Sequence, residues 1–394
     1  MISFDAALAI LVAEATPLAT ESVALDAAHG RVLAEPCIAQ VDAPRSDISV
    51  MDGYALRDAD LALGAPFRVI GAAYPGTAFE GRVEAGTCVR LFTGAPLPQG
   101  ADRVVVQEDV ARNGDAMRVV GTLSGKRYIR PHGSDFRAGE TLLDAGTVLG
   151  PRALVAAAGA DMAMLPVWRR PRLSVISTGD ELAEPGGARA RVGSIPESAS
   201  YGAAALGAAW GAEVVGRYRL RDDIAELTAG ATESLDEADV VVVTGGASVG
   251  EKDYAKQIFV SLGTEILFSR IAIMPGKPVW FGRRGAQFVL GLPGNPSSAM
   301  VTARLFLTTL LAGLSGRAPA DALRWRSARL MAPLDAASAR ETFVRARCDE
   351  GGVVSLANQD SGLQRALAEA DVLIRRMPHA EAAPTGTLVS IIDF

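Results

Sequence analysis

The sequence contains very few thiol or imidazole side chains. Its 394 residues include 3 cysteines and 3 histidines, and no two cysteines have the CxxC spacing. Widely separated residues of this kind do not match the ligand spacing of zinc sites or the paired cysteines of small disulfide-rich folds. We therefore exclude a zinc framework and a disulfide framework. The scattered histidines also argue against a Ser/His/Asp triad, and the P-loop pattern GxxxxGK[ST] is absent.

Basic runs and long apolar runs are scarce as well. The formal net charge is -6, and no Lys/Arg run is interleaved with aromatic residues, so nucleic acid is not an expected partner. The first segment, MISFDAALAILVAEA, carries Asp5 and Glu14 where a secretory signal would carry basic residues. The longest apolar runs, such as residues 305–314, are interpreted as too short to cross a bilayer. We expect a cytoplasmic protein with no membrane contact.

Lysine is rare although positive charge is not. Of 39 Lys and Arg residues, only Lys126, Lys252, Lys256 and Lys277 are lysines. Lys252 and Lys277 both fall in glycine-rich segments, where a compact ammonium group on a flexible stem can follow a phosphate. They are candidate anion-binding residues, and the alternative is a chance position on a solvated loop.

Hydrophobic residues make up 49% of the chain, and a chain of 394 residues is long enough for two to four domains. Apolar spacing predicts a helix over residues 3–15 behind a Ser3 cap, and Pro151 announces a second helix. Between them, from about residue 21 to 139, short β-rich runs alternate with Gly/Pro turns. This pattern predicts a mainly β module, and we expect the two flanking helical pieces to pack together.

After Pro171 strands and helices alternate up to about residue 316. This rhythm predicts a doubly wound parallel α/β sheet, in which ligands bind outside the carboxyl ends of the strands. The segments STGD, TGG and LPGNP all follow predicted strands and should meet at that edge. Residues 317–394 return to short strands, which favours a small barrel or sandwich.

Three glycine-rich turns, TGGASVGEKDY, IMPGKPVWFG and GLPGNPSSAM, lie between residues 238 and 300. Gly turns that follow strands and open helices point several backbone N–H groups at one spot, which favours an anion. Glu251 and Asp253 add hard oxygen ligands for a cation that bridges phosphates. A phosphate-bearing substrate with a divalent metal is therefore predicted. Taken singly, STGDEL is also typical of a helix start capped by Asp180, and GLPGNPSSAM of one capped by Asn295 or Ser297.

Eight ordered segments carry a family resemblance: MDGYALR, FTGAPLPQGAD, GSDFRAGE, STGDEL, TGGASVGEKDY, PGKPVWFG, GLPGNPSSA and QDSGLQRALAEADVLI. They resemble the molybdopterin molybdotransferases, the bacterial MoeA family, which is similar to the C-terminal part of gephyrin. The resemblance covers nearly the whole chain and implies a multidomain α/β protein. Its expected parts are a discontinuous helical domain (1–20 and 140–170), an inserted β-rich domain (21–139), a molybdopterin-binding doubly wound α/β domain (171–316) and a C-terminal β-barrel (317–394).

The resemblance also implies an activity. The family takes adenylylated molybdopterin and molybdate, cleaves the pyrophosphate with the help of Mg²⁺, releases AMP and leaves molybdenum on the dithiolene. It implies a homodimer with the site between subunits, and contact with the molybdopterin adenylyltransferase and with recipient molybdoenzymes. An adenylyltransferase-like enzyme and a non-catalytic molybdopterin-binding or scaffold protein are the alternatives. Molybdate and tungstate both stay open.

Matching the motifs one by one assigns site residues as expectations. The catalytic candidates are Asp52, Thr93, Asp135, Glu181, Asp222, Asp253 and Arg270, of which Asp52, Glu181, Asp222 and Asp253 are the expected metal ligands. The substrate-binding candidates are Thr178, Gly179, Asp180, Gly245, Gly246, Ser248, Gly250, Lys277, Pro293, Gly294, Asn295, Pro296 and Ser361. Because Asp52, Thr93 and Asp135 belong to the inserted domain, the implied dimer would turn them toward the partner's α/β domain.

Two positions depart from the family pattern. Met274 stands just before PGKP, where many members carry a basic residue, so that one anion contact is either missing or moved to Arg270. Glu197-Ser198-Ala199 stands where the family usually has an asparagine side chain. Both departures concern anion or pterin contacts and leave the expected fold unchanged.

Overall fold

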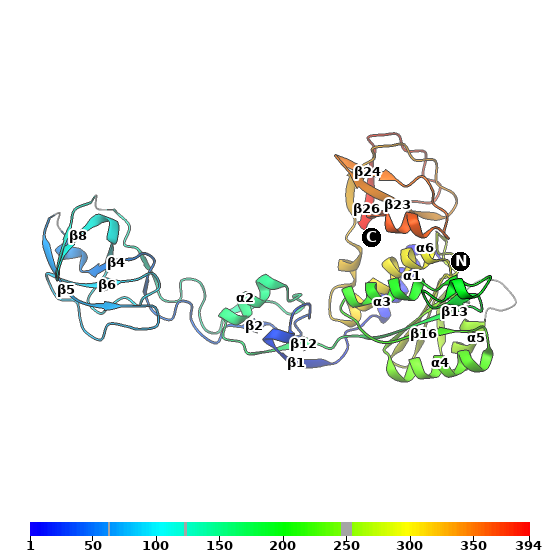
Figure 1. Ribbon diagram of the computed structural model, residues 1–394, viewed down its shortest axis with the longest axis horizontal. Helices are drawn as coiled ribbons and strands as arrows, with labels where there is room; N and C mark the ends of the chain where they lie inside the picture. The colour runs from blue at the N-terminus through cyan, green and yellow to red at the C-terminus, as the bar shows by residue number, and fades with distance from the viewer. Residues whose placement is uncertain (62–63, 122–123, 246–253) are drawn as a thin grey trace.

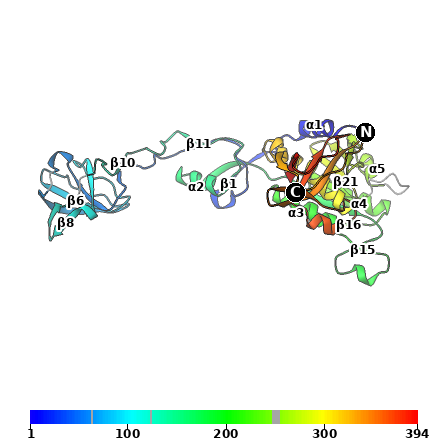
Figure 2. The same cartoon turned by 90° about the horizontal axis from the view of Figure 1, so that it is seen from above.

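The chain forms an elongated molecule with three successive regions (Figure 1). This computed structural model describes residues 1–61, 64–121, 124–245 and 254–394. The sheet of the inserted domain lies at one end, and a small unit containing α2 lies in the middle. The α/β and C-terminal domains lie together at the other end with both chain termini, and the view from above in Figure 2 shows the same order.

A mixed six-stranded sheet, in the order β16-β13-β17-β21-β20-β18, forms the centre of the α/β domain. The first four strands are parallel, but β20 runs antiparallel to both of its neighbours. The expectation of a wholly parallel sheet is wrong at β20, because Gly285 and Ala286 alone join it to β21, and so short a connection makes a hairpin. The strands are β13 (Arg172–Thr178), β16 (Glu213–Leu220), β17 (Val240–Thr244), β18 (Glu265–Ser269), β20 (Trp280–Arg284) and β21 (Gln287–Leu292).

Helices cover both faces of this sheet. Val240 and Val242 of β17 contact the core on the side of α3 and α6, whereas Val241 and Val243 contact the core on the side of α4 and α5. A strand buried on both faces reads as an unbroken β-branched run, which is why this segment is so apolar. The helices are α3 (Ala199–Ala209), α4 (Ile224–Glu237), α5 (Tyr254–Ser261), α6 (Pro296–Thr302) and α7 (Thr308–Leu314), and two short strands, β14 (Leu182–Ala183) and β15 (Ile195–Pro196), form a small arm.

A continuous apolar helix runs from Pro296 to Leu314, with a π-helical turn over Ala303–Leu307 between α6 and α7. By length and composition alone this helix is long and apolar enough to cross a membrane, because it begins well before the apolar run of residues 305–314. However, 94% of the tested window is buried inside the protein. It is the core helix of the α/β domain.

The first helix, α1 (Phe4–Glu14), begins behind Ser3, whose Oγ accepts a hydrogen bond from the Ala6 N–H at 3.1 Å. Its buried Phe4 and Leu11 belong to the α/β core together with Phe306. Helix α2 (Pro151–Gly159) belongs to another core, in the middle region. The structure therefore differs from the expectation that these helices pack together, because α7 and the sheet already cover the apolar face of α1.

The middle region is built from antiparallel strand pairs and α2. β1 (Thr20–Ala24) pairs with β12 (Met164–Trp168), and β2 (Cys37–Ile38) pairs with β11 (Thr141–Leu143). Leu33, Cys37 and Leu165 share one buried cluster with the helix. Residues 20–38 therefore pack with α2 and not with the inserted sheet, which differs from the expected division at residue 21.

The inserted domain is a six-stranded sheet in the order β7-β4-β6-β5-β9-β8. Tyr54 and Leu56 of β4 face one apolar cluster, and Ala55 faces a second cluster on the opposite side. This domain is β-rich as expected. Its strands are β4 (Gly53–Leu56), β5 (Pro66–Ala73), β6 (Thr87–Leu91), β7 (Arg103–Val106), β8 (Val110–Asn113) and β9 (Ala116–Val119), and β3 (Ile48–Ser49) pairs with β10 (Ile129–Arg130) at its base.

The C-terminal domain is a small barrel. Its strands follow the order β23-β25-β26-β22, β24 pairs with the other side of β23, and a bridge between Leu330 and Val353 closes the circle. The C-terminal sheet is extended by β19 (Ile273–Met274), which comes from the α/β domain and pairs with β23. The elements are β22 (Arg326–Arg329), β23 (Glu341–Asp349), β24 (Gly352–Ser355), α8 (Gln364–Ala368), β25 (Val372–Arg376) and β26 (Leu388–Asp393).

An ion pair fixes the chain where it returns from the middle region to the α/β domain. Arg169 Nη1 and Nη2 donate to the two carboxylate oxygens of Asp239 at 2.7 and 2.9 Å, and the Arg172 N–H donates to the same carboxylate at 2.7 Å. Burial alone would raise the pKa of Asp239, but these hydrogen bonds outweigh it and hold the pKa below its usual value.

We predict that Asp239→Asn lowers the free energy of unfolding by about 2 kcal/mol at neutral pH. The folded-state pKa lies below the unfolded value of about 3.9, so this stabilisation is complete above that value and is lost as the pH falls through the folded pKa. Urea unfolding, followed by tryptophan fluorescence, should therefore show that the free energies of unfolding of the wild type and Asp239→Asn become equal at acidic pH. The control is Asp236→Asn, an exposed carboxylate of α4. Equal pH profiles for wild type and Asp239→Asn would contradict the assignment.

Candidate functional site

The carboxyl ends of four parallel strands bring several predicted site residues to one edge of the sheet. Ser177 of β13 is paired with Thr244 of β17, Thr178 with Leu220 of β16, and Thr244 with Leu292 of β21. Ten of the expected residues lie at the ends of these strands or just beyond them: Thr178, Gly179, Asp180, Glu181, Asp222, Gly245, Pro293, Gly294, Asn295 and Pro296. The parallel register thus gathers them as the sequence predicted.

The backbones of three of these turns are in close contact. Gly245 has φ of 87°, and a Cβ added to it would lie 2.5 Å from the Thr178 carbonyl oxygen. A Cβ on Gly294 would lie 3.3 Å from the Gly245 Cα. Only glycine fits such an approach without moving the strands. The result is a floor of exposed backbone with little side-chain bulk, which we call the strand-tip floor (Thr178, Gly245 and Gly294).

One hydroxyl group in the strand-tip floor has no visible partner. Thr178 is only 6% exposed, and its Oγ1 is buried. This oxygen makes no hydrogen bond within the described part of the chain. A buried polar atom without a partner is costly and therefore points to a ligand or to a neighbour that completes it. This observation suits the predicted substrate-binding role of Thr178.

The acidic side chains lie on the neighbouring tips of β13 and β16. The Glu181 carboxylate lies directly over Gly179, since a Cβ on that glycine would be 2.8 Å from Glu181 Oε2. The Asp222 N–H donates to Asp180 Oδ1 at 3.2 Å, which ties the two turns together. Among the residues that the structure describes, no three His, Cys, Asp or Glu side chains form a ready metal cage.

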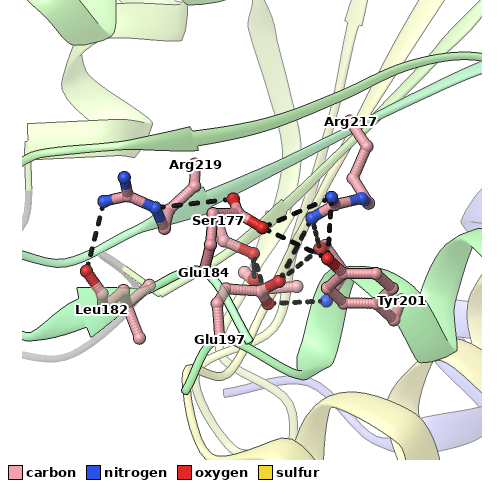
Figure 3. A network of polar contacts seen from close by, with 9 residues as sticks. Ser177, Leu182, Glu184, Glu197, Tyr201, Arg217 and Arg219 are labelled. Atoms are coloured by element: carbon pink, nitrogen blue, oxygen red, sulfur yellow. Dashed lines mark hydrogen bonds and ion pairs between the residues drawn. The ribbon is translucent and has the colours of Figure 1, made fainter. Parts of the chain in front are cut away.

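A buried carboxylate, Glu197, is bonded to the strand end that comes just before the strand-tip floor (Figure 3). Glu197 is 2% exposed and accepts hydrogen bonds from Ser177 Oγ at 2.9 Å, from the Ser200 N–H at 2.8 Å and from Ser200 Oγ at 2.6 Å. Arg217 Nη1 lies 3.5 Å from its second oxygen. The Ser177 and Thr244 hydroxyls are themselves 2.9 Å apart. Glu197 therefore joins the ends of β13 and β17 to the start of α3.

An outer layer of charged and aromatic side chains covers this carboxylate in Figure 3. The Arg217 guanidinium lies 3.8 Å above the centre of the Tyr201 ring and donates to its hydroxyl at 3.0 Å. Arg219 Nε lies 3.6 Å from Glu184 and Arg219 Nη1 donates to the Leu182 carbonyl at 3.1 Å. These contacts fasten the arm of β14 and β15 to the edge strand β16.

The C-terminal domain reaches the site from the other side. Asn295 stands at the N-cap position of α6, but its side chain makes no capping bond; its Nδ2 donates instead to Ser361 Oγ at 2.8 Å. The cap predicted for Asn295 is therefore wrong. Gln364 Nε2 donates to Ser198 Oγ at 3.1 Å. Ser361, one of the substrate-binding residues that the family resemblance implies, thus lies beside the GNP turn.

Arg345 is a candidate functional residue that sequence reasoning missed. It is 1% exposed, its Nη1 donates to Ser297 Oγ and to the Asp360 carbonyl, and its Nη2 has no partner among the described residues. Burial lowers the pKa of this guanidinium. The sequence did contain one signal for its burial. Arg345 comes two residues after Phe343 in β23, and residues two apart on a strand face the same side, which here is buried.

Arg270 and Lys277 lie on the loop between β18 and β20. The Ile271 N–H donates to the Lys277 carbonyl at 3.0 Å, which brings the two predicted residues to the same base of the loop, and both are exposed. Arg270 has φ of 66°. The other predicted members of the cradle, Gly246, Ser248 and Gly250, and the predicted ligand Asp253 lie outside the described residues.

The acidic residues of the inserted domain are not at this edge of the same chain. Thr93 donates to Asp52 Oδ1 through its N–H and its Oγ1, both at 2.8 Å, and these bonds hold the pKa of Asp52 below its usual value. Asp135 donates its N–H to the Ala43 carbonyl at 2.9 Å. Within one chain the middle region separates the inserted sheet from the strand-tip floor (Figure 1).

Known proteins share this arrangement. Three family models match the chain: the MoeA N-terminal region, domains I and II, at residues 2–160; a probable molybdopterin binding domain at 174–313; and the MoeA C-terminal region, domain IV, at 327–394. The molybdopterin molybdenumtransferase 2 of Mycobacterium tuberculosis is 33% identical over 384 residues, 94% of each chain. This chain belongs to the MoeA family.

Two further relatives agree with this. The molybdopterin molybdenumtransferase of Haemophilus influenzae is 35% identical over 302 residues, which cover 76% of this chain and 74% of that protein. The crystal structure of the molybdopterin biosynthesis MoeA protein from Pyrococcus horikoshii OT3 superposes with a TM-score of 0.83 at 26% identity, over 100% of both chains. The expected fold class is therefore confirmed.

We predict that Glu197→Ala lowers the free energy of unfolding by about 3 kcal/mol, because it leaves Ser177, Ser200 and Arg217 without their shared acceptor. Glu197→Gln keeps an acceptor oxygen and should cost less. The control is Glu184→Ala, a half-exposed carboxylate of the same network (51% exposed), for which about 0.5 kcal/mol is expected. Chemical unfolding measures all three variants, and equal losses for Glu197→Ala and Glu184→Ala would contradict a supporting role.

Proposed function

We propose that this chain is a molybdopterin molybdenumtransferase, which inserts molybdenum from molybdate into adenylylated molybdopterin and releases AMP. The strand-tip floor carries the proposal, because three strand ends meet there with minimal side-chain bulk and a buried hydroxyl without a described partner. Such a floor suits an anionic group held by backbone N–H donors. Relatives named molybdopterin molybdenumtransferase support the assignment over most of the chain.

The chemistry requires positive charge at this edge. The substrate diphosphate and the incoming molybdate are both anions, so their approach is unfavourable unless fixed donors and cations neutralise them. Backbone N–H groups of the glycine turns, the exposed cations Arg270 and Lys277, and the buried guanidinium of Arg345 beside Ser297 supply that charge. The proposed roles of these side chains are to bind and orient the two anions.

The carboxylates at the ends of β13 and β16 are suitable ligands for a hydrated Mg²⁺. This ion usually keeps several waters and takes one or two carboxylates together with substrate phosphates, so it needs no preformed cage. Glu181 and Asp222 on neighbouring strand ends provide oxygen donors of that kind. When bound, Mg²⁺ would neutralise the diphosphate and stabilise charge on the leaving AMP. We retain Asp253 as a further proposed ligand on sequence grounds.

We also propose a homodimer in which the inserted domain of one copy completes the site of the other. The inserted sheet, whose strand β4 directly follows Asp52, lies apart from the α/β domain of its own chain (Figure 1), so a shared site requires a second copy. Contacts with the adenylyltransferase that makes the substrate and with recipient molybdoenzymes, and a cytoplasmic location, are part of the same proposal. An adenylyltransferase or scaffold role is not favoured, since the relatives that match along most of the chain are named molybdopterin molybdenumtransferases.

The direct test incubates the protein with adenylylated molybdopterin, Mg²⁺ and molybdate and follows AMP formation and protein-bound molybdenum together. Both should rise in parallel, and omission of molybdate or addition of EDTA should suppress them. Lys277→Ala should reduce the rate of AMP release by about a hundredfold, the usual effect of losing one charge-stabilising group. AMP formation without molybdenum retention, or consumption of ATP with molybdopterin, would contradict the proposal.

The dimer is tested by heterodimers purified through two different tags. We predict that Asp52→Ala and Glu181→Ala homodimers are both nearly inactive, whereas their heterodimer regains about half of the wild-type AMP release, because one of its two sites then carries neither substitution. The matched control pairs Glu181→Ala with Asp222→Ala. Both changes lie in the α/β domain, so each site keeps one defect and no recovery is expected. Failure of the first pair to recover would place each site within one chain.

A further inference from the structure

The loop between β18 and β20 is a small closed unit that carries uncompensated positive charge. The Arg270 N–H donates to the Val279 carbonyl at 2.9 Å and the Ile271 N–H to the Lys277 carbonyl at 3.0 Å, which closes its base. Gly276 presses against α6, since a Cβ there would lie 2.3 Å from Thr302 Cγ2. The loop is therefore held against the core helix, and its charged side chains are exposed at its surface.

Pairing with the C-terminal barrel adds a third cation to this loop. Ile273 is paired with Glu341 and Met274 with Thr342, in the parallel register of β19 and β23. This register places Arg340, one residue before β23, at the outer edge of the loop. Its Nη1 donates to the Ile273 carbonyl at 3.4 Å, and its Nη2 lies 3.5 Å from Met274 Sδ. The guanidinium thus covers the uncharged side chain at position 274.

No carboxylate neutralises these cations within the described part of the chain. Arg270, Lys277 and Arg340 make no ion pair there, and the adjacent carboxylate of Glu341 is already engaged by Arg375. By contrast, the exposed Arg324 has a close acidic partner, Asp321, at 2.6 Å. Three like charges around one short loop repel each other, and a bound anion relieves that repulsion.

We propose that Arg340 acts with Arg270 and Lys277 to bind a tetrahedral oxyanion, and that it supplies the positive charge that Met274 does not. A guanidinium presents a planar fork of donors and binds two oxygens of such an anion at once. The identity of the anion, molybdate or the phosphate of the adenylylated substrate, rests on the proposed function. The binding role of Arg340 does not, because it can be measured with the isolated anions.

The test is titration calorimetry of the full-length protein with sodium molybdate and, in a separate arm, with AMP. Arg340→Ala should weaken binding of at least one anion by about tenfold, the effect of losing one charge-assisted contact. Arg340→Lys should keep most of the affinity, and Met274→Lys in the Arg340→Ala background should restore much of it. Loss in the molybdate arm alone identifies molybdate as the ligand, and loss in the AMP arm alone identifies the phosphate.

The matched control is Arg347→Ala, an exposed arginine of the same strand β23, which should leave both affinities unchanged. Thermal unfolding of Arg340→Ala checks that the variant is folded. Wild-type affinity of Arg340→Ala for both anions, absence of binding by the wild-type protein, or failure of Met274→Lys to restore binding would overturn the proposal. Anion binding that depends on Arg340 in a protein that releases no AMP would sustain this inference while refuting the transferase.

Discussion

The contact between the turns that follow β13, β17 and β21 is the constraint on which the rest of the site depends. A side chain at Gly245 would collide with the Thr178 carbonyl at 2.5 Å, and one at Gly294 would press on Gly245 itself. The first would require the ends of β13 and β17 to move apart, and the second would require a smaller shift beside β17, whose Thr244 pairs with Leu292. Parallel pairing, the shape of the floor and the exposure of its backbone donors are therefore consequences of the same glycines.

Beneath this floor, a buried carboxylate replaces the apolar packing that normally supports strand ends. Burial of the charge on Glu197 is unfavourable unless donors surround it, and Ser177, Ser200 and Arg217 supply those donors. Because the Ser177 hydroxyl contacts both Glu197 and the Thr244 hydroxyl, this carboxylate is connected to both strand ends through Ser177. Ala199 stands where the family pattern has an asparagine side chain. It is buried at the start of α3, two residues after Glu197.

The local sequence predicted individual helices and strands better than it predicted which of them pack together. The unbroken apolar run of β17 and the cap at Ser3 identify a buried strand and a helix start without tertiary information. The packing of α1 on the α/β core was not predictable, because an apolar stripe shows that a helix is covered but does not specify which surface covers it. The reversal at β20 was readable in principle, since a two-residue connection at Gly285 permits only a hairpin.

The same limit applies to the site. Glycine turns after strands are visible in the sequence, and so the STGD, TGG and GNP segments were placed at one edge correctly. Arg345 and Arg340 were missed for a different reason. Their positions depend on the docking of the barrel, through β19 and β23 and through the contact of Asn295 with Ser361, and no motif in the α/β segment encodes that docking.

The two modules attached to the α/β domain differ in how they are fixed, and this difference suits the proposed division of labour. The barrel shares a strand pair with the α/β domain, and its Arg375 joins Glu341 to Asp5 of α1, so its basic residues are held rigidly against the loop. Among the residues that the structure describes, the inserted sheet is joined to the rest of the molecule through the middle region alone (Figure 1). Cations that bind an anion must stay close together against their own repulsion, which requires a rigid support. In the dimer that we propose, Asp52 would reach the site from the inserted sheet of the other copy. Its carboxylate would then stay away from the phosphates, which it would otherwise repel, until the two copies and the cation come together.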